Sequence, residues 1–237
     1  MAGILVQLAL SWIILWFFAK EHLTVLGIIP TKKRLINLSI GFAFAAICCV
    51  LYFAIKALIE KSVWRINPNY SLSRALSSSW WVFISVLYEE LIFRGALLYL
   101  AIKKLGAKKA CILSAVCFGI YHWFTFNAWG NPMAMIFVFF MTGIWGYMFA
   151  MAFAKTKSLY LPIGLHLGWN LVNMIVFSFG AMQTQFIVKT PDVKLPLISW
   201  LTILLIQTFT LPVLVFWYLR LQSNKENRMI QNQGLSQ

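Results

Sequence analysis

Long apolar runs without charge constrain this chain more than any other feature of its sequence. Residues 1–19, 35–55 and 111–154 contain no Asp, Glu, Lys or Arg. A helix needs about 20 mostly apolar residues to cross a bilayer, so each of these runs is long enough to span one. Charged residues make up 11% of the chain, compared with about 25% in ordinary soluble domains. The sequence therefore excludes a soluble globular protein and predicts one that crosses a membrane several times.

We predict an all-α, polytopic membrane helix bundle with about seven transmembrane helices, within a range of six to eight. The longest run is divided in two because Asn127, Gly130, Asn131 and Pro132 form a turn signal inside it. A membrane β-barrel would instead show alternating segments of roughly ten residues. The predicted spans are 1–19, 35–55, 76–102, two spans within 111–154, 159–181 and 195–219.

Further expectations concern the segments between and after the spans. The pieces around Ile28 and Ile66 are short and partly apolar, and we expect interfacial helices or half-spans there. Residues 1–221 are predicted to form a single transmembrane domain. The polar residues 222–237 are predicted to form a flexible tail.

The distribution of basic residues predicts an orientation in the cell membrane. If seven spans are correct, the loops on one side carry thirteen Lys and Arg residues, and those on the other side carry six. Cytoplasmic loops are enriched in Lys and Arg, so we expect the N-terminus outside and the C-terminus in the cytoplasm. The net charge of +14 does not indicate a nucleic-acid partner, because the cations lie in short clusters between apolar runs.

Two adjacent carboxyl groups and an arginine lie inside the third predicted span. An ionised residue at the centre of a membrane helix costs about 2.5–3.5 kcal/mol on insertion scales, so such residues are functional candidates. Glu90 and Arg94 are four residues apart and can form an ion pair on one helix face, which indicates a supporting role. Glu89 points about 100° away and must meet a partner on another helix, which suits a general base.

Histidine and asparagine side chains supply the polar groups of two further spans. His122 lies in the fourth span, and His166 and Asn170 lie one turn apart on the same face of the sixth. Together with Glu89 they provide a base, two imidazoles and an amide donor. Such a group can activate a water molecule and stabilise a developing oxyanion, so hydrolysis of an acyl bond is the predicted reaction.

Three short motifs carry a resemblance to a known family. The segment from Glu89 to Gly95 (EELIFRG) resembles the EExxxR signature of the CPBP intramembrane proteases. The segment from Phe118 to His122 (FGIYH) is similar to the FxxxH motif of that family, and His166 to Asn170 (HLGWN) is similar to its HxxxN motif. The family takes in type II CAAX prenyl endopeptidases and bacteriocin-processing or bacteriocin-immunity proteins.

The resemblance covers residues 76–180 approximately and implies a protease-like core there, in a multi-pass membrane hydrolase that cleaves a peptide bond in or near the bilayer. By analogy, Glu89 and His122 would activate the water, and His166 and Asn170 would form the oxyanion site. The family has been described both as metal-dependent and as glutamate-dependent. Glu89, His122 and His166 could hold a divalent metal such as zinc with one open position. The residues present do not require a metal, and we favour the glutamate-dependent reaction.

A non-catalytic function remains as the alternative. A membrane regulator, immunity factor or scaffold would use the same polar cluster for binding, and would tolerate Glu89→Gln. The expected partners are the lipid bilayer and a peptide or membrane-anchored protein substrate. No residue distinguishes a prenylated CAAX substrate from a peptide or bacteriocin precursor, and none indicates an oligomeric state.

Overall fold

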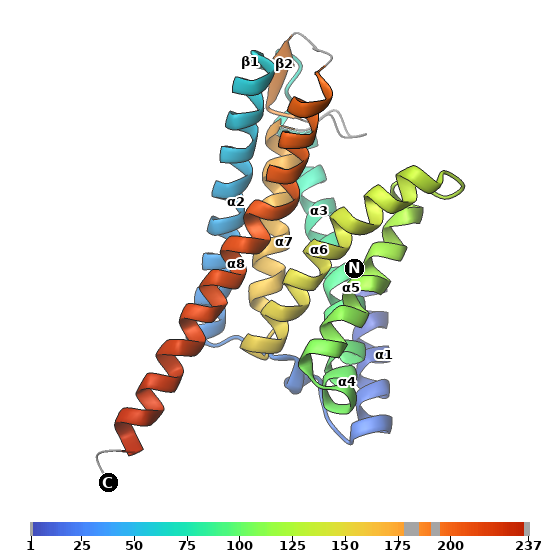
Figure 1. Cartoon of the computed structure of the whole chain (residues 1–237). Coiled ribbons are helices and arrows are strands. Elements are labelled where there is room, and N and C mark those ends of the chain that lie inside the picture. The colour runs from blue at the N-terminus through green and yellow to red at the C-terminus, as the bar shows by residue number, and fades with distance from the viewer. Residues whose placement is uncertain (1, 178–184, 191–194, 235–237) are drawn as a thin grey trace.

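The computed structural model describes residues 2–177, 185–190 and 195–234, and this part of the chain is almost entirely helical (Figure 1). The all-α membrane bundle predicted from the sequence is confirmed. The elements in chain order are α1 (Ala2–Ala19), a 3₁₀ turn (Leu23–Leu26), α2 (Lys32–Glu60), β1 (Val63–Ile66), α3 (Leu72–Arg94), α4 (Ala96–Leu105), α5 (Ala107–Thr125), α6 (Pro132–Thr156), α7 (Tyr160–Leu171), a π-helical turn (Val172–Phe177), β2 (Ile187–Thr190) and α8 (Leu197–Gly234).

The long helices correspond to the predicted spans. Within the described residues, five helices are long and apolar enough to cross a membrane: α1, α2, α6, α7 with its π-helical turn, and α8. Helices α3 and α5 occupy the two remaining predicted positions; α3 carries Glu89, Glu90 and Arg94, and α5 carries His122. The last residues of the predicted span 159–181, from 178 onward, lie outside the described residues.

The predicted third span is not one continuous helix. It breaks at Gly95, between α3 and α4. A Cβ atom at this position would lie 2.1 Å from the carbonyl oxygen of Leu91, so the backbone conformation at the break requires glycine. The continuous helix expected over 76–102 is therefore wrong, and α4 is a separate ten-residue helix.

A small sheet replaces one of the expected helical pieces. Strand β1 contains Ile66 and pairs antiparallel with β2, with Val63 opposite Thr190 and Ile66 opposite Ile187. Val and Ile have branched side chains that favour extended backbone. The prediction of an interfacial helix or half-span around Ile66 is therefore wrong. The piece around Ile28 follows the short 3₁₀ turn and is not helical itself.

The polar tail expected from residue 222 begins inside α8, which continues to Gly234. No Pro or Gly occurs between residues 222 and 233 to end the helix earlier. The flexible tail over 222–237 is thus helical as far as Gly234. The single-domain boundary at 221 stays a prediction.

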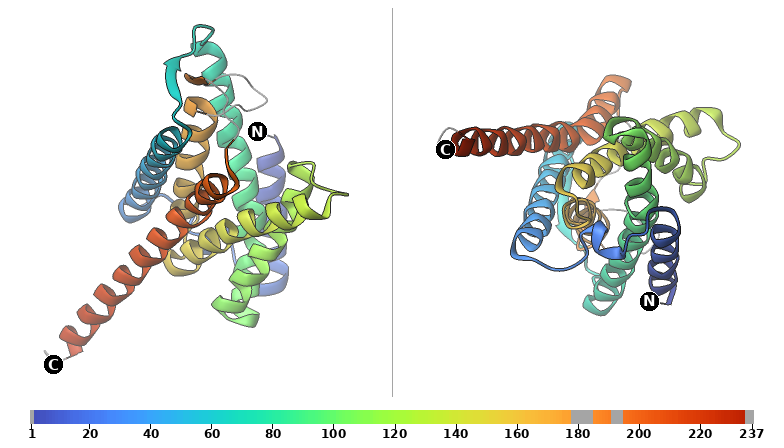
Figure 2. Two further views of the ribbon diagram at one scale, coloured as in Figure 1. Left: turned by 45° about the horizontal axis from the view of Figure 1, so that its top comes forward. Right: turned by 90° about the horizontal axis from the view of Figure 1, so that it is seen from below.

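Helix α7 packs very closely on α2. Gly164 and Gly168 lie one turn apart on α7, and a Cβ atom on either would be 2.3 Å from the carbonyl oxygen of Leu38 or Phe42 on α2. Small residues spaced four apart allow the backbones of membrane helices to approach in this way. Figures 1 and 2 show α7 beside α2 and near the middle of the bundle. This contact fixes the position of the helix that carries His166 and Asn170.

The connections gather at two ends of the molecule. The α1–α2 connection, the α4–α5 turn, the α6–α7 turn and the C-terminus lie toward the lower end in Figure 1, and the sheet lies at the upper end. The lower end thus holds the loops that are richest in Lys and Arg.

Candidate active site

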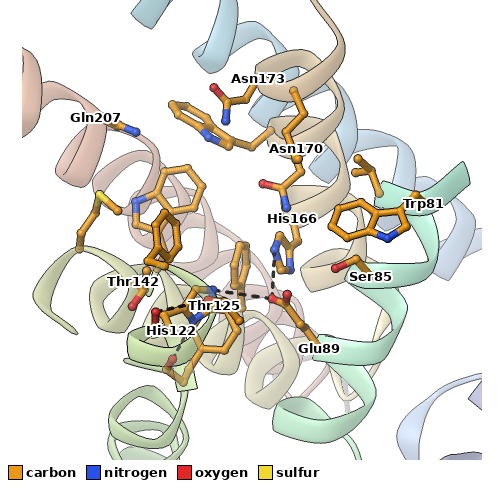
Figure 3. Close-up of a pocket in the computed structure, with 18 residues that line it drawn as sticks. Trp81, Ser85, Glu89, His122, Thr125, Thr142, His166, Asn170, Asn173 and Gln207 are labelled. Carbon is orange, nitrogen blue, oxygen red and sulfur yellow. Dashed lines mark hydrogen bonds and ion pairs between the residues drawn. The ribbon is translucent and has the colours of Figure 1, made fainter. Parts of the chain in front are cut away.

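A cavity of about 390 Å³ opens between the helices that carry the three motifs (Figure 3). Its wall combines a few polar side chains with many aromatic ones, as is usual for ligand sites. Five helices and the π-helical turn contribute to it. The lining residues are Trp81, Val82, Ser85 and Glu89 of α3, Phe118, His122 and Thr125 of α5, Phe126 directly after α5, Met141, Thr142, Trp145 and Phe149 of α6, His166, Trp169 and Asn170 of α7, Asn173 and Met174 of the π-helical turn, and Gln207 of α8.

The carboxyl group of Glu89 lies between two imidazole rings at one end of this cavity. Its Oε2 atom is 3.7 Å from Nε2 of His166 and 4.0 Å from Nε2 of His122, and the three side chains are 8–13% exposed. The same oxygen has no hydrogen-bond partner among the described residues. Separations of this size are longer than a direct hydrogen bond and are typical of groups that share a water molecule.

Glu90 and Arg94 form the ion pair that their spacing predicts. Arg94 Nη1 donates to Glu90 Oε1 at 3.2 Å, and both side chains are fully buried. The guanidinium also donates from Nη2 to the carbonyl oxygen of Gly146 at 3.2 Å and lies 4.2 Å from the ring centre of Phe118. The pair therefore connects α3 with both α5 and α6.

The ring of His166 is oriented by two neighbours. Its Nδ1 atom lies 2.8 Å from Glu90 Oε1, the oxygen that Arg94 also contacts. The ring stacks on Phe149 with 4.7 Å between ring centres. With Nδ1 and one face occupied, Nε2 is the nitrogen that faces Glu89 and the cavity. Sequence spacing predicted the Glu90–Arg94 pair but not this contact between Glu90 and His166.

The ring of His122 is oriented differently. Its Nδ1 atom is 2.8 Å from the carbonyl oxygen of Phe118, one turn earlier on α5. A carbonyl oxygen can only accept, so Nδ1 carries the hydrogen and donates it. In a neutral ring this leaves Nε2 as an acceptor directed at Glu89.

The structure brings all four predicted catalytic residues to the same cavity. Asn170 follows His166 by one turn of α7 and lies beside it in the cavity wall (Figure 3). Glu90 and Arg94 lie behind this wall, in contact with His166 and Phe118. The roles assigned to these residues stay predictions.

The cavity also contains polar residues that the sequence motifs do not include. Ser85 lies one turn before Glu89 and interacts with its carboxyl group, so the i−4 spacing on α3 was the available signal. Thr142 and Gln207 come from α6 and α8, where no spacing relation to the motifs exists. The positions of Thr142 and Gln207 in the cavity wall depend only on how α6 and α8 cross the other helices.

The metal set predicted from the sequence was Glu89, His122 and His166. Among the described residues, no group of three or more His, Cys, Asp and Glu side chains is arranged to hold a metal ion. Zinc binding stays a prediction to be tested by metal analysis.

Residues 72–172 match the family of type II CAAX prenyl endopeptidase Rce1-like proteins. The matched segment contains all three motifs and most of the cavity wall. No curated protein and no solved structure matches the chain significantly. The resemblance to the CPBP family is thus confirmed for the segment that holds the candidate active site.

Proposed function

We propose that this chain, which carries a CPBP-type protease core over residues 72–172, is an intramembrane endopeptidase that hydrolyses peptide bonds with a water molecule activated by Glu89 and His122. The observation that supports this proposal is the position of Glu89. Its unpartnered carboxyl oxygen lies between two imidazole nitrogens inside a cavity large enough for a peptide segment.

The attacking water would lie between Glu89 and His122. The carboxylate accepts one of its protons, and the acceptor nitrogen of His122 holds the other hydrogen in a hydrogen bond. As the proton moves to Glu89, the water oxygen forms a bond to the carbonyl carbon of the substrate. The product of this step is a tetrahedral intermediate with a negative charge on the former carbonyl oxygen.

His166 and Asn170 are proposed to stabilise that charge. The amide nitrogen of Asn170 is a donor in any state. Nε2 of His166 donates when the ring carries both protons, since Nδ1 is already directed at Glu90. Donors aimed at a developing oxyanion contribute strongly to catalysis in a site with little water. The carbon–nitrogen bond then breaks, and Glu89 returns its proton to the leaving amine.

The family match supports a membrane-embedded peptide or protein as substrate in general. Three tryptophans, Trp81, Trp145 and Trp169, line the cavity and favour apolar substrate side chains. A CAAX-type substrate and a peptide or bacteriocin precursor are both compatible with this wall. The proposed location is the cell membrane, with the basic end of the bundle in the cytoplasm.

The first test compares the wild-type protein with Glu89→Gln in detergent, using a library of apolar peptides and mass spectrometry of the products. The amide keeps the shape of the side chain but cannot accept the proton, so we expect cleavage to fall at least about 100-fold. Glu21→Gln is the matched control. Glu21 lies outside the cavity and pairs with Lys103 near the surface, so its replacement should leave cleavage unchanged.

A chelator arm and a measurement of bound metal accompany this test. Cleavage by Glu89→Gln at the wild-type rate would refute the proposed mechanism. Loss of wild-type cleavage with chelator, together with one equivalent of zinc in the purified protein, would assign a metal-dependent reaction instead. A wild-type protein that binds peptides but cleaves none would favour the non-catalytic alternative.

A further inference from the structure

Gln207 brings a polar side chain into the cavity from outside the segment that matches the family. It lies on α8, and its side chain is directed at the cavity at the end where Asn173 lies (Figure 3). Most of α8 near this point is apolar, for example Ile203 and Leu211, which are buried in the core, and the adjacent Thr208 is buried as well. A primary amide in such surroundings needs hydrogen-bond partners, because membrane interiors supply none.

One half of the Gln207 amide already has a partner. The hydroxyl group of Tyr52, on α2, donates to Oε1 of Gln207 at 3.0 Å. Tyr52 is 7% exposed, and its ring packs against Trp169 at 5.7 Å between ring centres. Because this buried ring has little freedom, its hydroxyl group fixes which way the amide of Gln207 points.

The other half of the amide is available to a ligand. With Oε1 held by Tyr52, the side-chain nitrogen Nε2 of Gln207 faces the cavity (Figure 3). The structure gives Nε2 no partner among the described residues. Nε2 is not one of the buried polar atoms that lack a partner, so it keeps accessible surface and a ligand in the cavity can supply its acceptor.

We infer that Gln207 binds a backbone carbonyl oxygen of the substrate and so forms a subsite for the peptide chain, an inference that rests on the proposed protease function. A substrate must be extended at the scissile bond, so its peptide groups there make no hydrogen bonds with each other. At membrane depth those groups need partners from the protein. The amides of Asn173 and Gln207 supply them at the end of the cavity away from Glu89.

The charge of the cavity favours a peptide carbonyl over a free carboxylate. The eighteen described lining residues include no Lys or Arg, and they include the carboxyl group of Glu89. A substrate carboxylate at the Gln207 end of the cavity would therefore be taken out of water without a Lys or Arg partner, which is strongly unfavourable. The subsite should bind neutral peptide groups within the substrate chain.

The spacing along α7 and the π-helical turn that follows it indicates which peptide group this is. Asn173 follows His166 by seven residues, which corresponds to about 10 Å along a helix. An extended peptide covers about 3.3 Å per residue. The carbonyl oxygen that meets Gln207 is therefore expected about three residues from the scissile bond, on one side of it.

The experiment uses the full-length protein in detergent and a peptide that the wild type cleaves. Each peptide bond within four residues of the scissile bond is replaced, one at a time, by a thioamide, whose sulfur is a weaker acceptor than oxygen. We expect KM of the wild type to rise about 3- to 10-fold at one position, the size of a lost hydrogen bond. For Gln207→Leu, KM should already be raised about as much with the normal peptide, with kcat little changed and no further penalty at that position.

The matched control is Gln222→Leu. Gln222 also lies on α8 and also forms a hydrogen bond with a tyrosine hydroxyl, that of Tyr218, but it does not line the cavity. Its replacement should leave KM and the thioamide profile unchanged. Tyr52→Phe keeps the ring and removes only the hydroxyl group, so it should raise KM in the same direction as Gln207→Leu and to a smaller extent.

A thioamide penalty that persists unchanged in Gln207→Leu would overturn the subsite while leaving the protease function intact. If Gln207→Leu does not fold, Tyr52→Phe carries the same comparison, and an unchanged profile in that variant would also overturn the inference. If the wild-type protein cleaves no peptide, the proposed function fails, and the subsite fails with it.

Discussion

One oxygen atom of Glu90 joins the buried ion pair to the imidazole of His166. Oε1 lies 3.2 Å from Arg94 Nη1 and 2.8 Å from His166 Nδ1, and no water-accessible surface remains on either Glu90 or Arg94. The two charges compensate each other only while both are present. The buried ion pair and the orientation of the His166 ring thus depend on the same oxygen atom of Glu90.

Removing one member of this pair should be strongly destabilising. Glu90→Gln leaves the guanidinium of Arg94 buried without an anion, which costs roughly 3–5 kcal/mol when a buried pair is broken. The expected result is a large drop in the thermal unfolding temperature in detergent. The double variant Glu90→Leu/Arg94→Leu removes both charges and should recover much of the loss in stability, though not the activity.

The control for this prediction is the exposed pair between Lys103 and Glu21, whose side chains are 48% and 36% exposed. Lys103→Gln should change stability by less than about 1 kcal/mol, because surface ion pairs contribute little. Equal effects of Glu90→Gln and Lys103→Gln would contradict the structural importance assigned to the buried pair.

The residues of the candidate site differ in how readily the sequence reveals them. Glu89, His122 and His166 are conspicuous because titratable side chains are costly in apolar spans, and their convergence could be predicted from that cost alone. Gln207 carries no charge and has no motif residue near it on its own helix, so its place in the cavity could not be predicted from the sequence. The contact of His166 with Glu90 depends on the rotation of α7 against α3, which spacing within one helix cannot give.

At the level of elements, the α2–α7 contact sets where His166 and Asn170 lie. Gly168→Ala would place a methyl group 2.3 Å from the carbonyl oxygen of Phe42, so the helices must separate by about 1 Å to restore ordinary contact. A displacement of this size in a catalytic group can cost about 100-fold in rate. We therefore expect Gly168→Ala to lower kcat/KM about 100-fold in the peptide-cleavage assay.

Gly143→Ala on α6 is the matched control for this substitution. The nearest atom to its added methyl group would be the carbonyl oxygen of Ala115 at 3.6 Å, an ordinary contact. This variant should keep its activity and stability. Full activity of Gly168→Ala would show that the close contact does not position His166.

Helix positions could be predicted from the sequence, but two local features could not. The break at Gly95 lies in a run that is apolar on both sides, and one glycine does not by itself end a helix. The pairing of β1 with β2 joins residues about 120 positions apart in the chain, and nothing within either four-residue strand specifies the partner. Both features depend on tertiary contacts rather than on local pattern.

At the scale of the whole molecule, the distribution of charge predicts the orientation in the membrane. The end of the bundle with the C-terminus also holds the α1–α2 connection and the α4–α5 turn, which are rich in Lys (Figure 1). We expect a tag at the C-terminus to be accessible only from the cytoplasm and a tag at the N-terminus only from outside.

A third tag inserted at Gly106 controls for the effect of the terminal tags. This residue lies in the α4–α5 turn, where no atom lies within 4 Å of an added Cβ. It should be accessible from the same side as the C-terminus. Detection of both termini on one side would contradict the arrangement of seven crossings.

The sheet has a mechanical consequence for how a lipid-borne chain can reach the cavity. Strand β1 connects α2 to α3, and β2 lies between α7 and α8, so their pairing ties these four helices together at one end of the bundle. The α5–α6 hairpin, which supplies His122 and Thr142, is not part of that tie. If a substrate entered the cavity sideways from the membrane by moving these four helices apart at that end, the hydrogen bonds between β1 and β2 would have to break. Movement of the α5–α6 hairpin would leave those hydrogen bonds intact.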